Sequence, residues 1–304
     1  MHKAIRVFVT EGCNASCKNC FNSSIRGCQE IAPNRFEELC KYLVSSGFTS
    51  LKMMGGEPTV HTQFQTIYQI SKAYFKNVAL FTNSLNDEVC HIEPREKDTI
   101  IYNMNFEKTL TKEKLLIEKK GRRTLKYQIT DHTDEKELIN SITNWKKIDN
   151  RVKPSFTFDC VSNIFEQKDI LQSKIVFLEK ELNSLQIEYG FDHRVPVCFL
   201  LGCKEKLSYP SGCCKVENSG LIDSSLNIRY CNQNHNSIIS LINSNGEFKS
   251  WNIIENYLLK YYYQQQLEIL KGKCIDCELY GDICNGGCWG TKNSDYVVPQ
   301  TISV

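Results

Sequence analysis

Three cysteines near the N-terminus have the spacing of a metal-binding loop. Cys13, Cys17 and Cys20, called the cysteine triad below, directly follow an apolar segment that predicts a strand. Three thiolates are one fewer than a closed zinc site needs. In a four-iron cubane each cysteine holds one iron, so three leave the fourth iron open to another ligand. The triad predicts such a cluster, and the alternative is a zinc ion completed by a distant histidine or cysteine.

A second motif, Gly55-Gly56-Glu57-Pro58, follows the next predicted strand. Two adjacent glycines let the backbone approach a ligand closely, and the glutamate can pair with an ammonium group. A tight turn would also explain the glycine pair. Its position in phase with the cysteine triad, on the neighbouring strand, favours a shared site.

A further group of cysteines lies in the last third of the chain. The runs at residues 274–277 and 284–288 combine dense ligand spacing with glycines that let the backbone fold around a metal. A zinc knuckle is the alternative interpretation. Five more cysteines precede these runs: Cys198, Cys203, Cys213, Cys214 and Cys231.

The elements that must position these motifs alternate between strand and helix. Apolar runs and helical periodicity predict a parallel sheet, open or curled into part of a barrel, with its functional loops at the carboxyl ends of the strands. Asn34 is the expected N-cap of the first helix. The charged segment Lys112–Lys126 is expected to be a solvated helix face. Strands are expected at residues 5–10, 50–54, 78–81, 100–104, 126–130 and 155–159, and helices at 36–43, 64–74, 134–147, 166–189 and 251–270.

The bulk composition limits the setting and the partners. The chain has 304 residues, 16 cysteines and a formal net charge of +2. Neither a signal peptide nor a membrane-spanning apolar stretch is present, so we expect a reducing, cytoplasmic setting without a membrane. In that setting clustered cysteines favour metal ligation over disulfides. The balanced charge gives no basic field for nucleic acid, which we do not expect as a partner.

The triad spacing C-x-x-x-C-x-x-C and the G-G-E motif at the end of the second strand resemble the radical S-adenosylmethionine superfamily. The resemblance implies a redox [4Fe-4S] cluster on the triad, with S-adenosylmethionine chelating the open iron. Gly55, Gly56 and Glu57 would contact the methionyl part of the cofactor. The family usually has an aromatic residue before the third cysteine, whereas this chain has Phe21 after it. Phe21 is the candidate for the adenine contact, and the candidates for ribose or substrate contacts at strand ends are Asn83, Asn105 and Asp131.

The C-terminal cysteines resemble the SPASM or twitch extension of radical enzymes. By that resemblance one auxiliary [4Fe-4S] cluster would use Cys203, Cys231, Cys288 and either Cys214 or the adjacent Cys213. A second cluster would use Cys274, Cys277 and Cys284. Its missing fourth ligand would be Cys198, Cys213, a substrate or water, and the alternative is that only one auxiliary cluster is present. The implied fold is α/β, a partial (β/α)6 TIM-type barrel over residues 1–190 with a small cysteine-rich extension over residues 191–304.

The function implied by the resemblance is reductive cleavage of S-adenosylmethionine to a 5′-deoxyadenosyl radical, which abstracts a hydrogen from a substrate. A ribosomally made peptide, crosslinked or oxidised by the enzyme, is the leading substrate, with flavodoxin or ferredoxin as electron donor. One alternative is a dehydrogenase or epimerase of a small molecule such as a sugar, aminocyclitol or amino acid. An alternative of another class is a non-catalytic iron–sulfur or zinc-binding protein. The sequence nominates no catalytic acid or base.

Overall fold

The computed structural model describes residues 3–17, 20, 22, 26–158, 167–191, 220–230, 237–269 and 278. Within these residues, ten strands form one sheet in the order β10-β9-β8-β1-β2-β3-β4-β5-β6-β7. Neighbours from β8 to β7 are parallel, and β9 and β10 join through antiparallel pairs. The strands are β1 (Ala4–Thr10), β2 (Ser50–Gly55), β3 (Asn77–Thr82), β4 (Thr99–Asn103), β5 (Arg122–Ile129), β6 (Val152–Phe158), β7 (Gly190–Phe191), β8 (Leu221–Ile222), β9 (Asn227–Arg229) and β10 (Ile239–Ser240).

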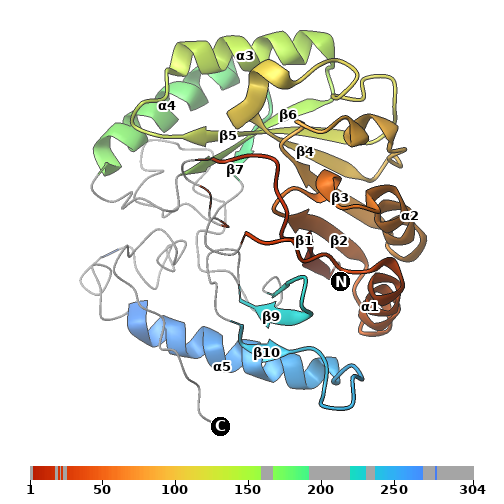
Figure 1. The fold of residues 1–304 in the computed structure, drawn as a ribbon. Coiled ribbons are helices and arrows are strands. Elements are labelled where there is room, and N and C mark those ends of the chain that lie inside the picture. Colours follow the sequence, from red (N-terminus) through yellow and green to blue (C-terminus); the bar gives the residue numbers. More distant parts are fainter. Residues whose placement is uncertain are drawn as a thin grey trace.

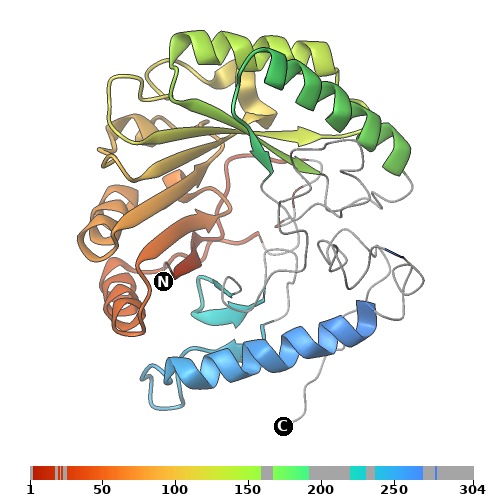
Figure 2. The same ribbon diagram turned by 180° about the vertical axis from the view of Figure 1, so that it is seen from behind.

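The first four helices lie on the outside of the curled sheet and alternate with its parallel strands (Figures 1 and 2). This arrangement confirms the predicted α/β class and partial barrel, while the predicted cysteine-rich runs lie outside the described residues. The helices are α1 (Pro33–Ser45), α2 (Phe64–Tyr74), α3 (Glu135–Ile148), α4 (Lys168–Ser184) and α5 (Trp251–Ile269), with short 3-10 turns η2 (Pro58–Val60), η3 (Asp87–His91) and η4 (Met104–Thr109).

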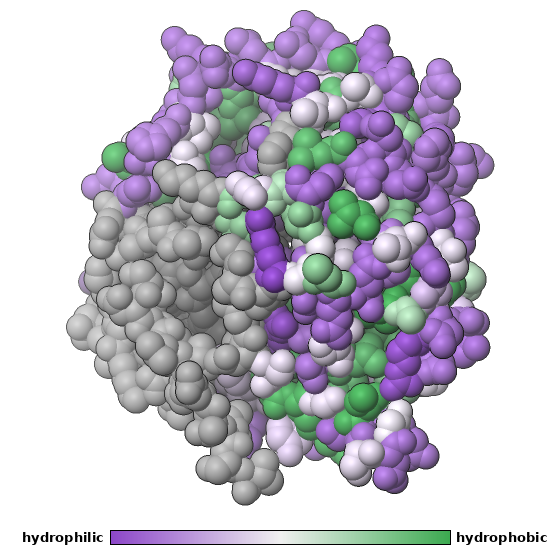
Figure 3. All heavy atoms as spheres, viewed as in Figure 1, coloured by the Kyte–Doolittle hydropathy of each residue, from purple (hydrophilic) through white to green (hydrophobic). Residues whose placement is uncertain are grey.

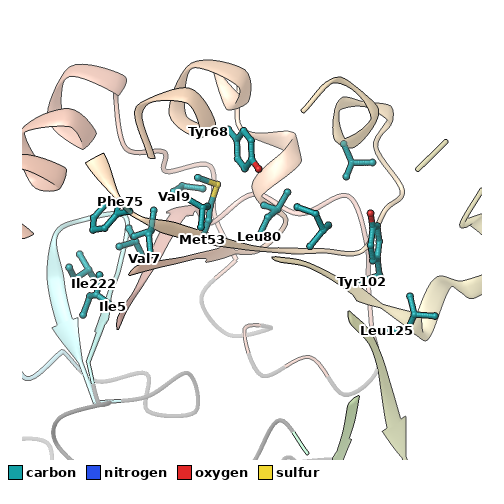
Figure 4. Packing of buried hydrophobic residues seen from close by; sticks show 14 of the residues in the cluster. Ile5, Val7, Val9, Met53, Tyr68, Phe75, Leu80, Tyr102, Leu125 and Ile222 are labelled. Carbon is teal, nitrogen blue, oxygen red and sulfur yellow. The ribbon is translucent and has the colours of Figure 1, made fainter. Parts of the chain in front are cut away.

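The outer face of the sheet carries the main apolar core. Val7, Met53 and Leu80 are fully buried beneath α1 and α2, beside Tyr68 of α2 (Figure 4). The parallel register places Val7 next to Met53, and Met53 next to Leu80. Because side chains alternate between the two faces of a strand, the intervening residues point to the concave side of the curled sheet, which is called the inner face below.

The inner face carries a smaller apolar cluster. Phe8, Met54 and Leu221 are buried there, and the partly buried Phe81 packs against them. Farther along β5 the half-buried Lys126 occupies the same face, with its Nζ 5.8 Å from the centre of the Phe81 ring. The inner face therefore combines a small apolar cluster with the charged side chain of Lys126.

The described part of the surface in Figure 3 is mostly polar, with apolar side chains scattered among the polar ones. None of the described helices combines the length and the apolar character that a membrane crossing requires. Exposed large apolar side chains are spread over or beside four helices: Val44, Ile148, Ile170, Val176, Leu185, Ile253 and Tyr263.

The predicted strands and helices up to residue 184 are confirmed with shifts of a few residues, but the predicted cap of α1 is wrong. Ala32 occupies the N-cap position without a side-chain hydrogen bond, and Pro33 begins the helix. Proline suits the first helical position because its missing N–H would have no helical partner there. Asn34 lies one residue inside the helix.

The expectation of a solvated helix over Lys112–Lys126 is also wrong. Turns precede β5 there, and Leu115 and Leu116 are buried. Arg123 is fully buried and donates from Nε to the Leu115 carbonyl at 2.9 Å and from Nη2 to the Lys119 carbonyl at 2.8 Å. The guanidinium has several N–H groups, and they donate to loop carbonyls that would be hydrogen-bonded within a helix. These bonds hold the segment in its non-helical conformation.

A short hairpin late in the chain completes the sheet beside β1. Leu221 and Ile222 of β8 pair in parallel with Arg6 and Val7 of β1, and β9 returns antiparallel to β8. The Asp223 carboxylate and the Arg229 guanidinium form a buried ion pair within the hairpin. The domain boundary near residue 190 stays a prediction, and the described residues beyond it extend the same sheet.

Candidate iron–sulfur centre

The loop that carries the cysteine triad leaves the sheet at the carboxyl end of β1 and returns to the same place. The Glu11 amide donates to the Gln29 carbonyl at 2.9 Å, and the Ile31 amide donates to the Val9 carbonyl at 3.0 Å. These two bonds close the loop at its base. The thiols between them are thus held above the end of β1, where loops of a parallel barrel form functional sites.

The three thiols line one pocket at the carboxyl ends of β1 to β5, which is called the triad pocket below. Its cavity has a volume of about 100 Å³. The cysteine triad and the Gly55–Glu57 motif therefore lie together at one edge of the sheet, as the sequence predicts. The lining residues are Cys13, Cys17, Cys20, Asn22, Arg26, Met54, Gly55, Gly56, Glu57, Pro58, Phe81, Thr82, Asn83, Ile101, Asn103 and Lys126.

Gly55 and Gly56 bring the end of β2 against the backbone of the triad loop. The Gly56 amide donates to the Thr10 carbonyl at 3.0 Å. A Cβ at Gly56 would lie 2.2 Å from the Gly12 carbonyl oxygen, and one at Gly55 would lie 2.3 Å from the Thr10 carbonyl oxygen. Both distances exclude a side chain. The glycine pair is therefore required by the contact between the two loops, and its predicted contact with the cofactor stays a prediction.

Glu57 is buried and accepts four hydrogen bonds from residues at the ends of β2 and β3. Its carboxylate accepts from the Thr59 amide and hydroxyl at 3.2 and 2.7 Å, from the Thr82 hydroxyl at 2.8 Å and from the Asn83 amide at 2.6 Å. Burial raises the pKa of this carboxyl, and the bonds from Asn83, Thr59 and Thr82 act in the opposite direction. Glu57 thus fixes the end of β3 to the pocket wall, and its contact with a cofactor ammonium stays a prediction.

The three strand-end candidates for ribose or substrate contacts differ in position. Asn83 lines the triad pocket and donates from Nδ2 to Asn14 Oδ1 at 2.8 Å. Asn105 is exposed and its side chain hydrogen-bonds to the Cys17 thiol. Asp131 does not line the triad pocket, and its carboxylate lies 3.7 Å from His132 Nε2. All three roles stay predictions.

Several predicted site residues lie outside the described residues, so the structure says nothing of their positions. They include the aromatic candidate for the adenine contact and every predicted ligand of the auxiliary clusters: Phe21, Cys198, Cys203, Cys213, Cys214, Cys231, Cys274, Cys277, Cys284 and Cys288.

Sequence reasoning missed several residues that line the triad pocket, among them Asn22, Arg26, Phe81 and Lys126. Asn22 and Arg26 closely follow the triad in sequence, and that proximity was the available signal. Phe81 and Lys126 occupy inner-face positions of β3 and β5, so the alternation of side chains along those strands could have indicated them.

The electrostatics around the triad depend on burial and on one cation. Burial raises the pKa of the Cys13 and Cys17 thiols, while the charge of Arg26 opposes that shift. A hydrogen bond from Arg26 to Cys20 raises the pKa of the guanidinium. Thiols held in this way bind a metal by losing their protons to solvent when the metal arrives.

The side chains present fit an iron–sulfur cluster and a polar cofactor. The triad supplies three half-buried sulfur donors to one pocket. Beside them the buried Asn22 Oδ1 has no hydrogen-bond partner in the described structure. Among the described residues, no three histidine, cysteine or acidic side chains are gathered around one ion position.

Comparisons of sequence relate parts of the chain to one family model and to two curated proteins. Residues 4–125 match a family model described as a 4Fe-4S single cluster domain. A segment of 106 residues is 26% identical to the probable GTP 3′,8-cyclase of Methanothermobacter marburgensis, and 112 residues are 29% identical to the mitochondrial GTP 3′,8-cyclase of Arabidopsis thaliana. The matches cover 34% and 35% of this chain, and 35% and 28% of those proteins.

Comparisons of structure extend the likeness of fold to most of the chain. A structure titled native anSMEcpe with bound AdoMet and peptide has a TM-score of 0.63 at 14% identity, covering 97% of this chain and 91% of that one. SuiB of Streptococcus suis bound to S-adenosylmethionine has a TM-score of 0.59 at 15% identity, covering 95% and 73%. SuiB bound to the precursor peptide SuiA has a TM-score of 0.57 at 13% identity, covering 76% and 59%.

In the described residues, three thiols line a pocket at the carboxyl edge of a curled parallel sheet. Both the triad and the G-G-E motif lie inside the segment that matches the 4Fe-4S single cluster domain. These findings support the predicted resemblance to the radical S-adenosylmethionine superfamily.

Proposed function

We propose that the protein is a radical S-adenosylmethionine enzyme that modifies a ribosomally made peptide. The observation that carries the proposal is the triad pocket, in which three thiols and the Gly55–Glu57 motif meet at the carboxyl edge of one parallel sheet. When bound, the cluster supplies the electron that cleaves S-adenosylmethionine, and the cleaved cofactor removes a hydrogen from the substrate.

The residues of the pocket have different proposed roles in holding the cluster and the cofactor. The triad holds the cluster, and Gly55 and Gly56 keep the end of β2 against the triad loop, in the part of the pocket wall that would face the methionyl end of the cofactor. Glu57 orients Asn83, whose side chain faces the pocket. The apolar base formed by Phe8 and its neighbours excludes water from the inner end of the site, which protects a reactive species from side reactions.

A peptide substrate is supported by an open groove between η4 and α3. In the groove, Trp145 Nε1 and the Ser141 hydroxyl donate to the Glu107 carboxylate, which fixes η4 to α3. Asn140 and Asn144 lie one helical turn apart on α3 and line the groove. Their amide groups can both donate to and accept from the backbone of an extended peptide.

The groove meets the triad at Asn105. This residue lines the groove and also hydrogen-bonds to the Cys17 thiol. A peptide seated along α3 would therefore have one end beside the cluster loop. The likeness of fold to proteins whose structures contain a peptide agrees with this proposal.

The C-terminal cysteines are proposed to hold one or two auxiliary [4Fe-4S] clusters, and a flavodoxin or ferredoxin is proposed to supply the electrons. Iron and sulfide counts on the anaerobically reconstituted protein test the number of clusters. Each cluster contributes four irons, so the Cys17→Ala variant should lose about four irons per chain and keep those of the auxiliary sites. A variant with no remaining iron would contradict auxiliary clusters.

The proposed activity is tested by anaerobic incubation of the full chain with S-adenosylmethionine and a strong reductant. Release of 5′-deoxyadenosine is expected from the parent and absent from Cys17→Ala. Cys28→Ala is the matched control, because this exposed cysteine belongs to the same loop but does not line the triad pocket. If the parent left S-adenosylmethionine intact, a non-catalytic iron–sulfur or zinc-binding protein would replace the proposal.

The substrate is tested by adding peptides encoded beside the gene and measuring their masses. A loss of two hydrogens from one peptide is the expected result for a crosslink or an oxidation. Replacing Asn140 and Asn144 together by alanine should raise the KM for that peptide and leave peptide-independent cofactor cleavage unchanged. An unchanged KM would remove the groove from the proposal.

A small molecule is the second candidate substrate, for one specific reason. The two curated relatives, which match about a third of this chain, are named for a reaction of GTP. Tight binding of a small polar metabolite, together with unmodified peptide masses, would favour a dehydrogenase or epimerase of such a molecule.

A further inference from the structure

Asn22 is the least expected side chain in the triad pocket. It lies two residues after Cys20, is 4% exposed and lines the pocket beside the three thiols. Its Nδ2 donates to the Gly55 carbonyl at 2.9 Å, at the end of β2. Its Oδ1 is buried and has no hydrogen-bond partner in the described structure.

The orientation of the Asn22 amide follows from its partner. The Gly55 carbonyl can only accept a hydrogen bond, so the NH2 group must face it; the flipped amide would set two acceptors against each other. Oδ1 must then point away from Gly55. An acceptor held in this way, buried and unpaired, is costly for the folded protein and is expected to have a donor when the site is filled.

We propose that Asn22 Oδ1 accepts a hydrogen bond from the α-ammonium group of S-adenosylmethionine and thereby positions the methionyl end of the cofactor. The inference rests on the proposed function, since it assumes that this cofactor enters the pocket. S-adenosylmethionine offers three kinds of hydrogen-bond donor, namely the ammonium, the adenine amine and the ribose hydroxyls. Asn22 is anchored at Gly55, next to the thiols, and the end of the cofactor that chelates iron must lie on that side of the pocket.

The first test compares two ligands of the anaerobically reconstituted protein by titration calorimetry. S-adenosylmethionine carries the ammonium group, whereas 5′-deoxy-5′-methylthioadenosine keeps the adenosine and sulfur but lacks it. Asn22→Ala should weaken S-adenosylmethionine roughly 10- to 100-fold, the effect of losing a hydrogen bond to a charged group. The affinity for methylthioadenosine should change less than about threefold. Equal losses for both ligands would overturn the assignment to the ammonium group.

A conservative variant separates cofactor contact from a merely structural role. Asn22→Asp presents a carboxylate, which accepts a hydrogen bond from an ammonium group but cannot donate to the Gly55 carbonyl. If Oδ1 holds the ammonium, this variant should bind S-adenosylmethionine more tightly than Asn22→Ala does. If Asn22 only anchors Gly55, the aspartate should be no better than alanine, and the proposal would fail.

Asn77 provides a matched control elsewhere in the chain. Its Oδ1 is likewise buried without a partner in the described structure, and its Nδ2 donates to the Ser50 hydroxyl at 3.2 Å, but it lies at the amino end of β3 and outside the triad pocket. Asn77→Ala should leave both affinities unchanged.

The outcomes also separate this inference from the proposed function. A parent protein that binds no S-adenosylmethionine would contradict the proposed function itself. A parent that binds it, with an Asn22→Ala variant of equal affinity and equal iron content, would leave the function intact and overturn the role of Asn22.

Discussion

The two faces of the sheet use the same strands for different purposes. On the outer face Val7, Met53 and Leu80 have no exposed surface and pack under the helices. On the inner face, one residue away along the same strands, Phe8 and Met54 form only a small apolar cluster. Among the described residues, apolar packing is therefore concentrated on one side of the sheet, and polar and thiol groups gather at the carboxyl edge of the other side.

The comparison predicts that the triad can lose its metal without loss of the fold. Cys13→Ser should abolish iron binding at the triad, because one sulfur donor is removed from a site that has only three. The free energy of unfolding of the metal-free protein should change by less than about 1 kcal/mol, as for other substitutions outside a packed core. Iron analysis and urea denaturation of the metal-free variant and parent measure the two effects. A large loss of stability in the metal-free state would contradict the division between the faces.

A substitution in the outer core should lower the stability of the fold and leave the binding of the cofactor unchanged. Leu80→Ala creates a cavity in the outer core and should cost about 2–5 kcal/mol of unfolding free energy. The affinity of the remaining folded molecules for S-adenosylmethionine should stay within about twofold of the parent, because Leu80 does not line the triad pocket. Denaturant titration and calorimetry give the two values, and a parallel fall in affinity would show that the faces are coupled.

Gly56 packs against the backbone of the triad loop and also lines the triad pocket. Its substitution should therefore affect both the stability of the fold and the binding of the cofactor. Gly56→Ala places a Cβ against the Gly12 carbonyl and should cost about 1–3 kcal/mol through overpacking. It should also displace the triad loop and lower the affinity for the cofactor.

Gly246→Ala is the control for Gly56, because Gly246 has a φ of +81° and nothing within 4 Å of an added Cβ. The strain of a left-handed alanine should cost about 1–2 kcal/mol, with no change in cofactor affinity. Equal affinities for the two alanine variants would place Gly56 outside the site.

The smallest expected effect concerns an ion pair at the amino end of β6. Burial tends to raise the pKa of Asp149, but its hydrogen bonds with Arg151 outweigh burial and leave the pKa below its ordinary value. A lowered folded-state pKa stabilises the protein above the ordinary aspartate pKa of about 3.9, and this contribution is lost as the pH falls further. The Tm difference between parent and Asp149→Asn should thus be largest near neutral pH and shrink below about pH 4. A constant difference would exclude the ion pair as its cause.

The sequence could predict features that depend on local pattern. The order of strands and helices follows from short-range apolar periodicity, and the meeting of the triad with Gly55–Glu57 follows because parallel strands end at the same edge. The role of Arg123 could not be predicted, because burial of a guanidinium depends on carbonyls supplied by a loop that the sequence presents as charged and solvated. The partners of Glu57 were missed for a similar reason, since Thr82 and Asn83 come from another strand.

The hairpin formed by β8 and β9 could not be predicted from the sequence either. β8 has only two residues, too few for a periodic signal, and it is a strand because β1 offers it an edge. Asn22 could not be assigned from sequence either. An isolated asparagine gives no pattern, and its buried, unpaired oxygen is visible only in three dimensions.

The pairing of β1 with β8 has a consequence for biosynthesis. During translation β1 and its cysteine loop leave the ribosome well before β8, so the second hydrogen-bonding neighbour of β1 arrives only with residues 221 and 222. Until then the nascent sheet keeps an open edge, which can pair with strands of other chains. A polypeptide interrupted shortly before residue 220 would retain the thiol loop and most of the sheet, yet it would be prone to aggregate through β1.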